Sequence, residues 1–270
     1  MCRVLGCVAS EPVSIRHELL EAENPLIRQS EQYDSGWGIA VYDRAEGGPP
    51  DCRRFATAAY ADPAFETATT ARGRIFNAHV RRATMGDLAP ENTHPFCLDT
   101  YSFGHNGTVL RYPRLLDPGV DPPQGQTDSE HLFKLLMSRY DRAAPVASLR
   151  HAVATAVERS PFSGLNFLFS DGERLFAYRL GLFELHWLAR PDALLVASER
   201  ATDEPWHSVQ QDVLLTLDPD DLEEPHAERL LGDELVARAN VLAIDVNTAL
   251  RGAERGRVAA ERARAVAAPE

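Results

Sequence analysis

Short runs in which apolar and polar residues alternate recur along most of this chain, and this pattern is typical of β-strands. Runs of this kind predict strands at residues 2–9, 37–42, 53–56, 74–81, 101–104, 165–170, 175–180, 183–188, 193–197 and 213–217. The first run carries no charge after Arg3, so we expect a strand that begins at the N-terminus itself.

A helical period separates the two groups of strands. Leu132, Leu135, Leu136 and Tyr140 recur at helical spacing and predict a helix over 128–140, which a second helix over 146–157 follows. Shorter helices are expected at 14–22, with Ser14 as N-cap, and from Pro63 to Gly73, with Asp62 as N-cap. Residues 24–36 and 117–125 read as loops, and the chain from Glu223 onward reads as helical or irregular.

Two helices between two sets of strands, joined by short connections, indicate a layered α+β fold. We expect a single domain over residues 2–250. The Ala- and Arg-rich segment 251–270 has little apolar periodicity, and we expect a frayed or disordered tail there.

Charge and cysteine content narrow the classes of function. Asp and Glu outnumber Lys and Arg by 40 to 28, and an acidic surface repels phosphate backbones, so nucleic acid is not an expected partner. No apolar run is long enough to predict a membrane span. None of the four cysteines forms a CxxC pair, and Cys2 and Cys7 stand too near the start for a secretory leader, which predicts a cytoplasmic protein with reduced, inert thiols.

Four short stretches carry candidate chemistry, although each also has an ordinary structural interpretation. They are Cys2, residues 79–84 (HVRRAT), Asn106-Gly107, and residues 127–130 (TDSE). A cysteine at position 2 is usually just a small residue, and Asn-Gly is a common hairpin turn. Thr-Asp-Ser-Glu before an apolar run is first of all a helix start.

In this order, the four stretches together resemble the type-2 glutamine amidotransferases, which belong to the N-terminal-nucleophile hydrolases. That family has an N-terminal cysteine, a His-x-Arg-x-Ala-Thr stretch, an Asn-Gly pair and a Ser/Thr-Asp-x-Glu element. Residues 34–38 (DSGWG) and 92–96 (NTHPF) also resemble its small, free-standing members. The resemblance covers about residues 2–220 and implies a four-layer α-β-β-α sandwich.

The resemblance also implies a role for each residue. Cys2, exposed once Met1 is removed, is expected to be the nucleophile, and its free α-amine, with a pKa of about 7.7–8.0, the base. Asn106 and Gly107 are expected to stabilise the oxyanion. Arg81 and Thr84 are expected to bind the substrate's α-carboxylate, and Asp128 its α-ammonium.

The chain departs from the family pattern at two positions. The synthase members often carry Trp and His where this chain has Arg82 and Met85. The missing aromatic weakens the expectation of an ordered lid, and the missing histidine removes one carboxylate contact.

The implied substrate is glutamine or another γ-glutamyl compound, with no cofactor and no metal, because His79, His94 and His105 lack metal-ligand spacing. Ammonia would pass to a separate synthase partner or be released. One alternative is a γ-glutamyl-conjugate amidohydrolase like those of ergothioneine biosynthesis. Another is a catalytically silent binding protein with the same fold.

Overall fold

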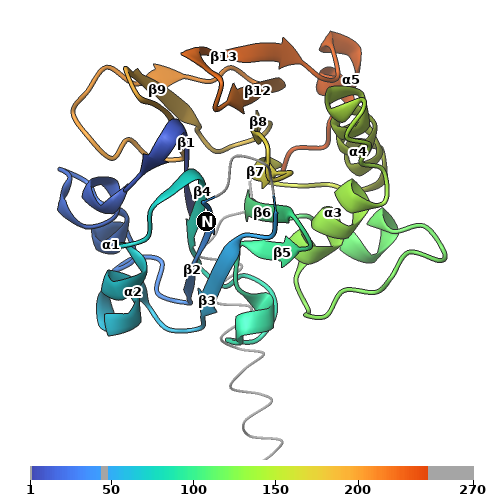
Figure 1. The fold of residues 1–270 in the computed structure, drawn as a ribbon. Coiled ribbons are helices and arrows are strands. Elements are labelled where there is room, and N and C mark those ends of the chain that lie inside the picture. Colours follow the sequence, from blue (N-terminus) through green and yellow to red (C-terminus); the bar gives the residue numbers. More distant parts are fainter. Residues whose placement is uncertain (1, 44–47, 243–270) are drawn as a thin grey trace, which may run out of the picture.

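Two antiparallel sheets lie face to face in the computed structural model, which describes residues 2–43 and 48–242 (Figure 1). The first sheet has the order β11-β9-β10-β1-β4-β2-β3 and consists of β1 (Arg3–Val13), β2 (Trp37–Tyr42), β3 (Asp51–Phe55), β4 (Gly73–Val80), β9 (His186–Arg190), β10 (Ala193–Ala197) and β11 (His207–Ser208). The second has the order β13-β12-β8-β7-β6-β5 and consists of β5 (Phe96–Leu98), β6 (Tyr101–Asn106), β7 (Asn166–Ser170), β8 (Leu175–Arg179), β12 (Val213–Asp218) and β13 (Asp221–Arg229).

Strand β1 is buried on both faces, because successive side chains point to opposite sides of a strand. Val4 and Val8 belong to the apolar cluster between the two sheets. Leu5 and Cys7 belong to a second cluster, on the outer face of the first sheet. β1 pairs with β4 on one side and β10 on the other, so it lies inside the sheet and not at its edge.

Helices cover the outer face of each sheet (Figure 1). Against the first sheet pack a π-helical turn (His17–Glu21), α1 (Leu26–Gln29) and α2 (Pro63–Ala68). Against the second sheet pack α3 (Asp128–Met137), α4 (Pro145–Arg159) and α5 (Asp233–Arg238). Short 3₁₀ turns occur at Ala59–Ala61, Pro90–Asn92 and Tyr112–Leu115. The order helix, sheet, sheet, helix confirms the expected four-layer α+β sandwich.

Most predicted strands and both long helices are confirmed, with shifted ends. Thr127 caps α3 by accepting a hydrogen bond from the Glu130 backbone nitrogen, and Asp62 caps α2 by accepting one from that of Ala64. The helix predicted at 14–22 is wrong in its start: β1 continues to Val13, and Ser14 accepts a hydrogen bond from Arg16 without capping a helix.

Three further predictions of secondary structure are corrected. The chain after Glu223 is a strand as far as Arg229, since β13 pairs with β12, and within residues 230–242 only α5 is helical. Helix α2 ends at Ala68, so Gly73 begins β4 instead of closing a helix. Residues 24–36, predicted as a loop, contain helix α1. Strands β5 and β11 were not predicted. The predicted tail over 251–270 lies outside the described residues.

A disulfide joins Cys52 on β3 to Cys97 on β5, which corrects the prediction that all four thiols are reduced. Strands β3 and β5 are edge strands of different sheets. The bond therefore links the two sheets at one open side of the sandwich. Cys2 and Cys7 are free and buried.

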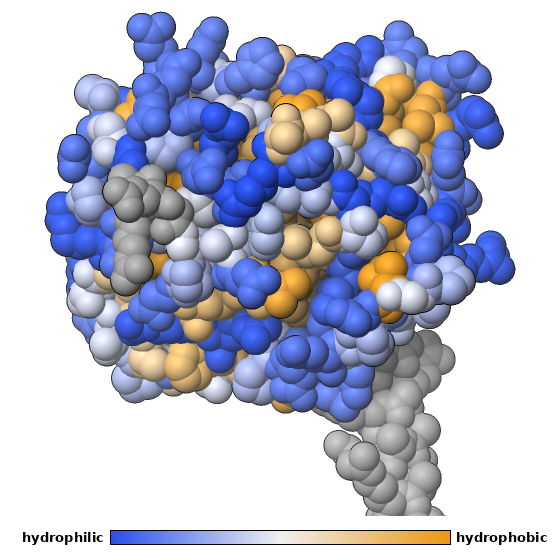
Figure 2. Space-filling view, turned by 45° about the vertical axis from the view of Figure 1, so that its right-hand side comes forward, coloured by the Kyte–Doolittle hydropathy of each residue, from blue (hydrophilic) through white to orange (hydrophobic). Residues whose placement is uncertain are grey.

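The surface offers little apolar area. Large exposed apolar side chains are scattered singly over the described residues: Phe55, Tyr60, Leu88, Leu98 and Leu182. Figure 2 shows a mainly hydrophilic face with small, separate apolar patches. Within residues 2–43 and 48–242, no helix combines the length and apolar character needed to cross a bilayer.

The disulfide should stabilise the sandwich. Its cysteines are 45 residues apart, and closing a loop of that size removes entropy from the unfolded chain. We expect the double variant Cys52→Ser, Cys97→Ser to lose about 2–4 kcal/mol in the free energy of unfolding. Denaturant titration of both proteins, with and without a dithiol reductant, measures this. Equal midpoints in the absence of reductant would show that the bond contributes nothing.

Candidate active site

Cys2 lies directly before β1 and is bonded to both sheets. Its backbone nitrogen donates a hydrogen bond of 3.0 Å to Asn106 Oδ1, at the end of β6. Its thiol lies 3.8 Å from the carbonyl oxygen of Arg82, just after β4. Only 8% of the residue is exposed. Cys2 is thus held between the two sheets, directly ahead of β1.

Asn106 and Gly107 do not form a hairpin turn. Asn106 pairs with Asn166 at the end of β6, so the strand's partner, β7, lies far along the chain. Asn106 Nδ2 is buried and has no hydrogen-bond acceptor among the described residues. A Cβ at Gly107 would lie 1.9 Å from the carbonyl oxygen of Gly164, so only glycine fits there. The pair therefore presents an unused amide donor next to Cys2.

His105 fixes this end of β6. Its Nε2 lies 3.1 Å from the carbonyl oxygen of Gly164, which can only accept, so Nε2 carries the proton. Its Nδ1 then accepts from the Ser129 hydroxyl at 2.9 Å. Burial lowers the pKa of His105 to about 4. The ring is therefore a neutral link from β6 to helix α3.

His79 and His94 form a second buried, neutral pair beside it. His79 Nε2 donates to the carbonyl oxygen of His105 at 3.2 Å, and the two rings of the pair stack with centroids 4.2 Å apart. Burial lowers the pKa of His79 to about 3 and that of His94 well below its usual range. Gly38 makes room for them, because a Cβ there would lie 2.3 Å from the His94 carbonyl oxygen. In the part of the chain that the structure describes, no group of three or more His, Cys, Asp or Glu side chains is placed to hold a metal ion.

Arg81 is almost fully buried, with 2% of the residue exposed. Its guanidinium donates to the carbonyl oxygens of Met85 at 2.9 Å, Asp87 at 3.1 Å and Gly86 at 3.4 Å. Burial lowers the pKa of Arg81, while the carboxylate of Asp128 and the thiol of Cys2 oppose that shift. The arginine thus shapes the loop that follows it and keeps a cation close to Cys2.

Asp128 is the first residue of α3 and is 3% exposed. Its Oδ2 accepts a 2.6 Å hydrogen bond from the Val109 backbone nitrogen. Burial raises the pKa of Asp128 to about 6, although backbone hydrogen bonds and the charge of Arg81 act in the opposite direction. This carboxylate is therefore poised to change charge just below neutral pH.

Thr84 and Glu130, from the same two sequence stretches, hold the surrounding loops. Thr84 Oγ1 lies 3.5 Å from Thr108 Oγ1, which joins the arginine stretch to the chain after Gly107. The carboxylate of Glu130 accepts from the backbone nitrogens of Gln124 and Gly125, both at 2.7 Å. Glu130 therefore orders the end of the Pro- and Gly-rich loop.

The structure thus joins the four stretches that the sequence singles out. Cys2 contacts Asn106 directly, Thr84 reaches Thr108, and Arg81 and Cys2 act on each other electrostatically, as do Arg81 and Asp128. Ser129 and Gly164, which hold His105, were not predicted. Ser129 lies within a predicted helix start, and Gly164 carries no side chain, so neither position offered a signal.

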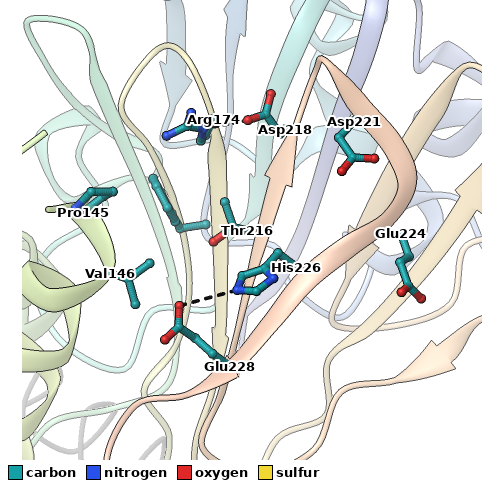
Figure 3. A pocket seen from close by; sticks show the side chains of 10 residues that line it. Pro145, Val146, Arg174, Thr216, Asp218, Asp221, Glu224, His226 and Glu228 are labelled. Carbon is teal, nitrogen blue, oxygen red and sulfur yellow. Dashed lines mark hydrogen bonds and ion pairs between the residues drawn. The ribbon is translucent and has the colours of Figure 1, made fainter. Parts of the chain in front are cut away.

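A cavity of about 330 Å³ lies elsewhere, where β8, β12 and β13 meet the start of α4 (Figure 3). Its charged residues are largely paired with one another or with neighbours: Arg174 with Asp218 at 2.7 Å, and His226 with Glu228 at 3.9 Å. None of the residues discussed above lines it. Its lining contains no cysteine, and the hydroxyl of Thr216 makes no hydrogen bond to His226, which lies opposite it on β13, so we do not identify it as an active site.

Comparison with known proteins agrees with this geometry. The family profile described as glutamine amidotransferases class-II matches residues 1–193. An uncharacterized protein of Methanocaldococcus jannaschii is 31% identical over 211 residues, which cover 70% of this chain and 54% of that protein. The Escherichia coli protein YafJ is 29% identical over 210 residues, which cover 70% of this chain and 76% of YafJ. This chain thus matches only about half the length of the archaeal relative.

Solved structures share the fold at lower sequence identity. A glutamine aminotransferase class-II domain protein from Silicibacter pomeroyi has a TM-score of 0.60 at 21% identity, covering 86% of this chain and 100% of that one. Glutamine phosphoribosylpyrophosphate amidotransferase from B. subtilis has a TM-score of 0.64 at 18% identity, covering 86% of this chain and 50% of that one. These matches show the sandwich of the N-terminal-nucleophile hydrolases.

The three buried histidines of this site, His79, His94 and His105, should make the fold sensitive to acid. Their pKa values are lowered in the folded state, so between about pH 6.5 and 4 the unfolded chain binds protons that the folded chain does not. Stability is complete above that range and is lost as the pH falls through it, by up to about 1.4 kcal/mol per pH unit for each histidine.

The variant His94→Phe tests this, because it keeps an aromatic ring against His79 and removes one titrating group. We expect a shallower fall in the free energy of unfolding between pH 6.5 and 4, measured by denaturant titration. The exposed His151→Asn serves as control and should keep the wild-type slope. A slope that is the same in all three proteins would contradict the prediction.

Proposed function

Because this chain belongs to the class-II glutamine amidotransferases, we propose that it hydrolyses the γ-amide of glutamine, or of another γ-glutamyl compound, with Cys2 as nucleophile. The observation that carries the proposal is the 3.0 Å hydrogen bond between the Cys2 nitrogen and Asn106 Oδ1, since it places the proposed nucleophile beside an unused amide donor. Hydrolysis of an amide needs a nucleophile, a base, an oxyanion site and a means of holding the substrate.

After removal of Met1, Cys2 would supply both the nucleophile, its thiol, and the base, its α-amine. The free α-amine, with a pKa of about 7.7–8.0, is partly neutral near pH 7 and takes the thiol proton, directly or through a water molecule. The thiolate attacks the γ-carbonyl carbon, and the proton passes to the departing nitrogen as ammonia leaves. Water then hydrolyses the glutamyl thioester to glutamate and restores the thiol.

The oxyanion would be held at the end of β6. Asn106 Nδ2 is a buried amide donor without an acceptor, which is costly unless a substrate supplies one. The Gly107 backbone nitrogen follows it directly and is the second proposed donor. Asn106 Oδ1 meanwhile holds the Cys2 nitrogen, so one side chain would orient the base and stabilise the negative charge.

Arg81 and Asp128 would hold the charged ends of the glutamyl group. The guanidinium has five N–H donors, and three bonds to carbonyl oxygens leave donors over for the α-carboxylate. Asp128, when ionised, would pair with the α-ammonium. Thr84, a partly buried neighbour of Arg81, would add a hydroxyl contact to the carboxylate.

The molecule that receives the released ammonia is a separate question from the hydrolysis itself. Ammonia would pass to a separate synthase partner or be released, and a γ-glutamyl conjugate is the alternative substrate. A catalytically silent scaffold is disfavoured, because it would have no need of an unpaired buried amide next to a free, buried thiol.

Selective labelling of Cys2 tests the proposal. We expect 6-diazo-5-oxo-norleucine to alkylate Cys2, because it carries the carboxylate and ammonium that Arg81 and Asp128 are proposed to hold, and we expect glutamine to protect it. Peptide mapping should find the adduct on an N-terminal peptide that lacks Met1. Cys2→Ser should neither acquire it nor release glutamate from glutamine.

Two outcomes would count against this assignment. Labelling of Cys7 without protection by glutamine would mean that the pocket does not bind glutamine, and fully active protein that retains Met1 would exclude the amine as base. Exclusion of this reagent, together with reaction of a larger γ-glutamyl electrophile, would favour the conjugate hydrolase.

Glutamine binding should weaken in acid because of Asp128. The pKa of the Asp128 carboxyl group is about 6 in the protein without substrate. Protonation below that pH removes the negative partner of the substrate's α-ammonium. In a Cys2→Ala variant, which separates binding from turnover, we expect the Kd for glutamine to rise about tenfold per pH unit below about pH 6. Calorimetry from pH 5 to 8 measures it. Asp128→Asn in the same background should bind weakly at every pH, and an equally steep curve there would assign the titration to another group.

A further inference from the structure

The residue after the proposed nucleophile has its own set of contacts. Arg3 Nη2 forms a 2.6 Å ion pair with Glu199 Oε2, and its guanidinium lies over the Tyr33 ring, 4.6 Å from the centroid. The side chain of Arg3 is 17% exposed and that of Glu199 45%. We propose that Glu199 is a positioning residue which, through Arg3, sets the place and the proton affinity of the Cys2 α-amine. The inference rests on the proposed function, in which that amine is the base.

Glu199 belongs to a short segment that is hydrogen-bonded to the start of β1. Regular pairing between β1 and β10 ends with Leu5 opposite Ala197. Beyond it, the Ser198 nitrogen donates to the Val4 carbonyl oxygen and the Val4 nitrogen donates to Ser198 Oγ, both at 3.0 Å. The ion pair of Glu199 extends these contacts by one residue, to Arg3. Every residue from Leu5 back to Arg3 is thus bonded to the same segment, so this anchoring ends one residue before Cys2.

Tyr33 closes the other side of Arg3. It is 4% exposed, and its backbone nitrogen donates to the Ser30 carbonyl oxygen at the end of α1. Burial raises the pKa of its hydroxyl, so the ring stays neutral and offers its face to the cation. Arg3, Glu199, Arg82 and Cys2 all act on Tyr33 electrostatically, which places these groups around one another.

The charges near the Cys2 nitrogen come from several elements. Arg3 precedes the rest of β1, Arg81 and Arg82 follow β4, Asp128 begins α3, and Glu199 follows β10. The nearby side chains His79, His105 and Tyr33 are neutral. The carboxylate of Asp87 also acts on Arg81, so three cations stand against three carboxylates. A net positive charge would favour the neutral amine, which is the form that accepts the thiol proton, and Glu199 offsets the charge of Arg3.

Variants that change the charge in opposite directions at Arg3 and Glu199 distinguish an electrostatic effect on the Cys2 α-amine from simple support of strand β1. Glu199→Gln leaves Arg3 uncompensated and should lower the pKa of the α-amine by about half a unit; Arg3→Met should raise it by a similar amount. Arg3→Lys keeps the charge and should keep the wild-type titration, while the loss of the planar fork and ring contact lowers kcat. Asp220→Asn is the matched control, since it removes the carboxylate partner of Arg74, at the far end of β4, and should shift nothing.

Two readouts are needed. The nitrogen-15 chemical shift of the Cys2 α-amine, in protein labelled with nitrogen-15 cysteine, reports the amine titration without any turnover. Above about pH 6, where Asp128 is largely ionised, the acid limb of kcat/KM for the γ-glutamyl substrate reports the same group in catalysis. We expect the two pKa values to move together, downward in Glu199→Gln and upward in Arg3→Met.

The outcomes distinguish the inference from the function on which it rests. Shifts of the same sign in both variants, or none in either, would assign Arg3 and Glu199 to strand support alone and overturn the inference. Opposite shifts in the spectroscopic titration without hydrolysis of any γ-glutamyl compound would overturn the proposed function and leave the electrostatic coupling standing. Should Arg3→Met fail to fold, Glu199→Gln and Arg3→Lys still decide, because only the former changes the net charge beside the amine.

Discussion

The hydrogen bond from the Cys2 nitrogen to Asn106 Oδ1 joins the beginning of one sheet to the end of a strand in the other. It forms only if the two sheets keep one separation and one register. Two side chains of β4 maintain that spacing by donating across the gap: Asn77 to Ser102 Oγ at 3.3 Å and His79 to the His105 carbonyl oxygen at 3.2 Å. The apolar cluster between the sheets fills the rest of the layer. The geometry around Cys2 is therefore a property of the whole sandwich and not of one loop.

Around this bond the protein buries polar groups that would be more stable in water. Arg81 is almost fully enclosed, and three backbone carbonyls compensate its guanidinium. The histidines avoid the larger cost of a buried charge by staying neutral. Asn106 Nδ2 is left without a protein partner. A site assembled in this way is ordered before a substrate arrives, and its remaining polar requirement is one that a developing oxyanion would meet.

Much of this arrangement could be predicted from local patterns. The apolar period and Thr127 defined α3, and the uncharged alternation after Arg3 defined β1, because burial and capping depend on neighbours in sequence. The grouping of Cys2, Arg81, Asn106 and Asp128 came from family resemblance, since contacts between distant segments leave no trace in periodicity. Strand β13 was missed because its exposed face is charged and Pro225 interrupts it; what makes it a strand is its pairing with β12. The Cys52–Cys97 bond was missed because it joins edges of two sheets whose proximity exists only in the folded protein.

Gly38 carries no chemistry, yet the carbonyl oxygen of His94 lies where its side chain would begin. Any larger residue there would push His94 away from β2 and disturb its stacking against His79. A survey of mutational tolerance across the chain would therefore mark Gly38 as strongly as a reacting group. A position that never varies among relatives would be equally hard to interpret, because both close packing and a role in catalysis prevent substitution. Only separate assays of folding and turnover tell which of the two an intolerant position serves.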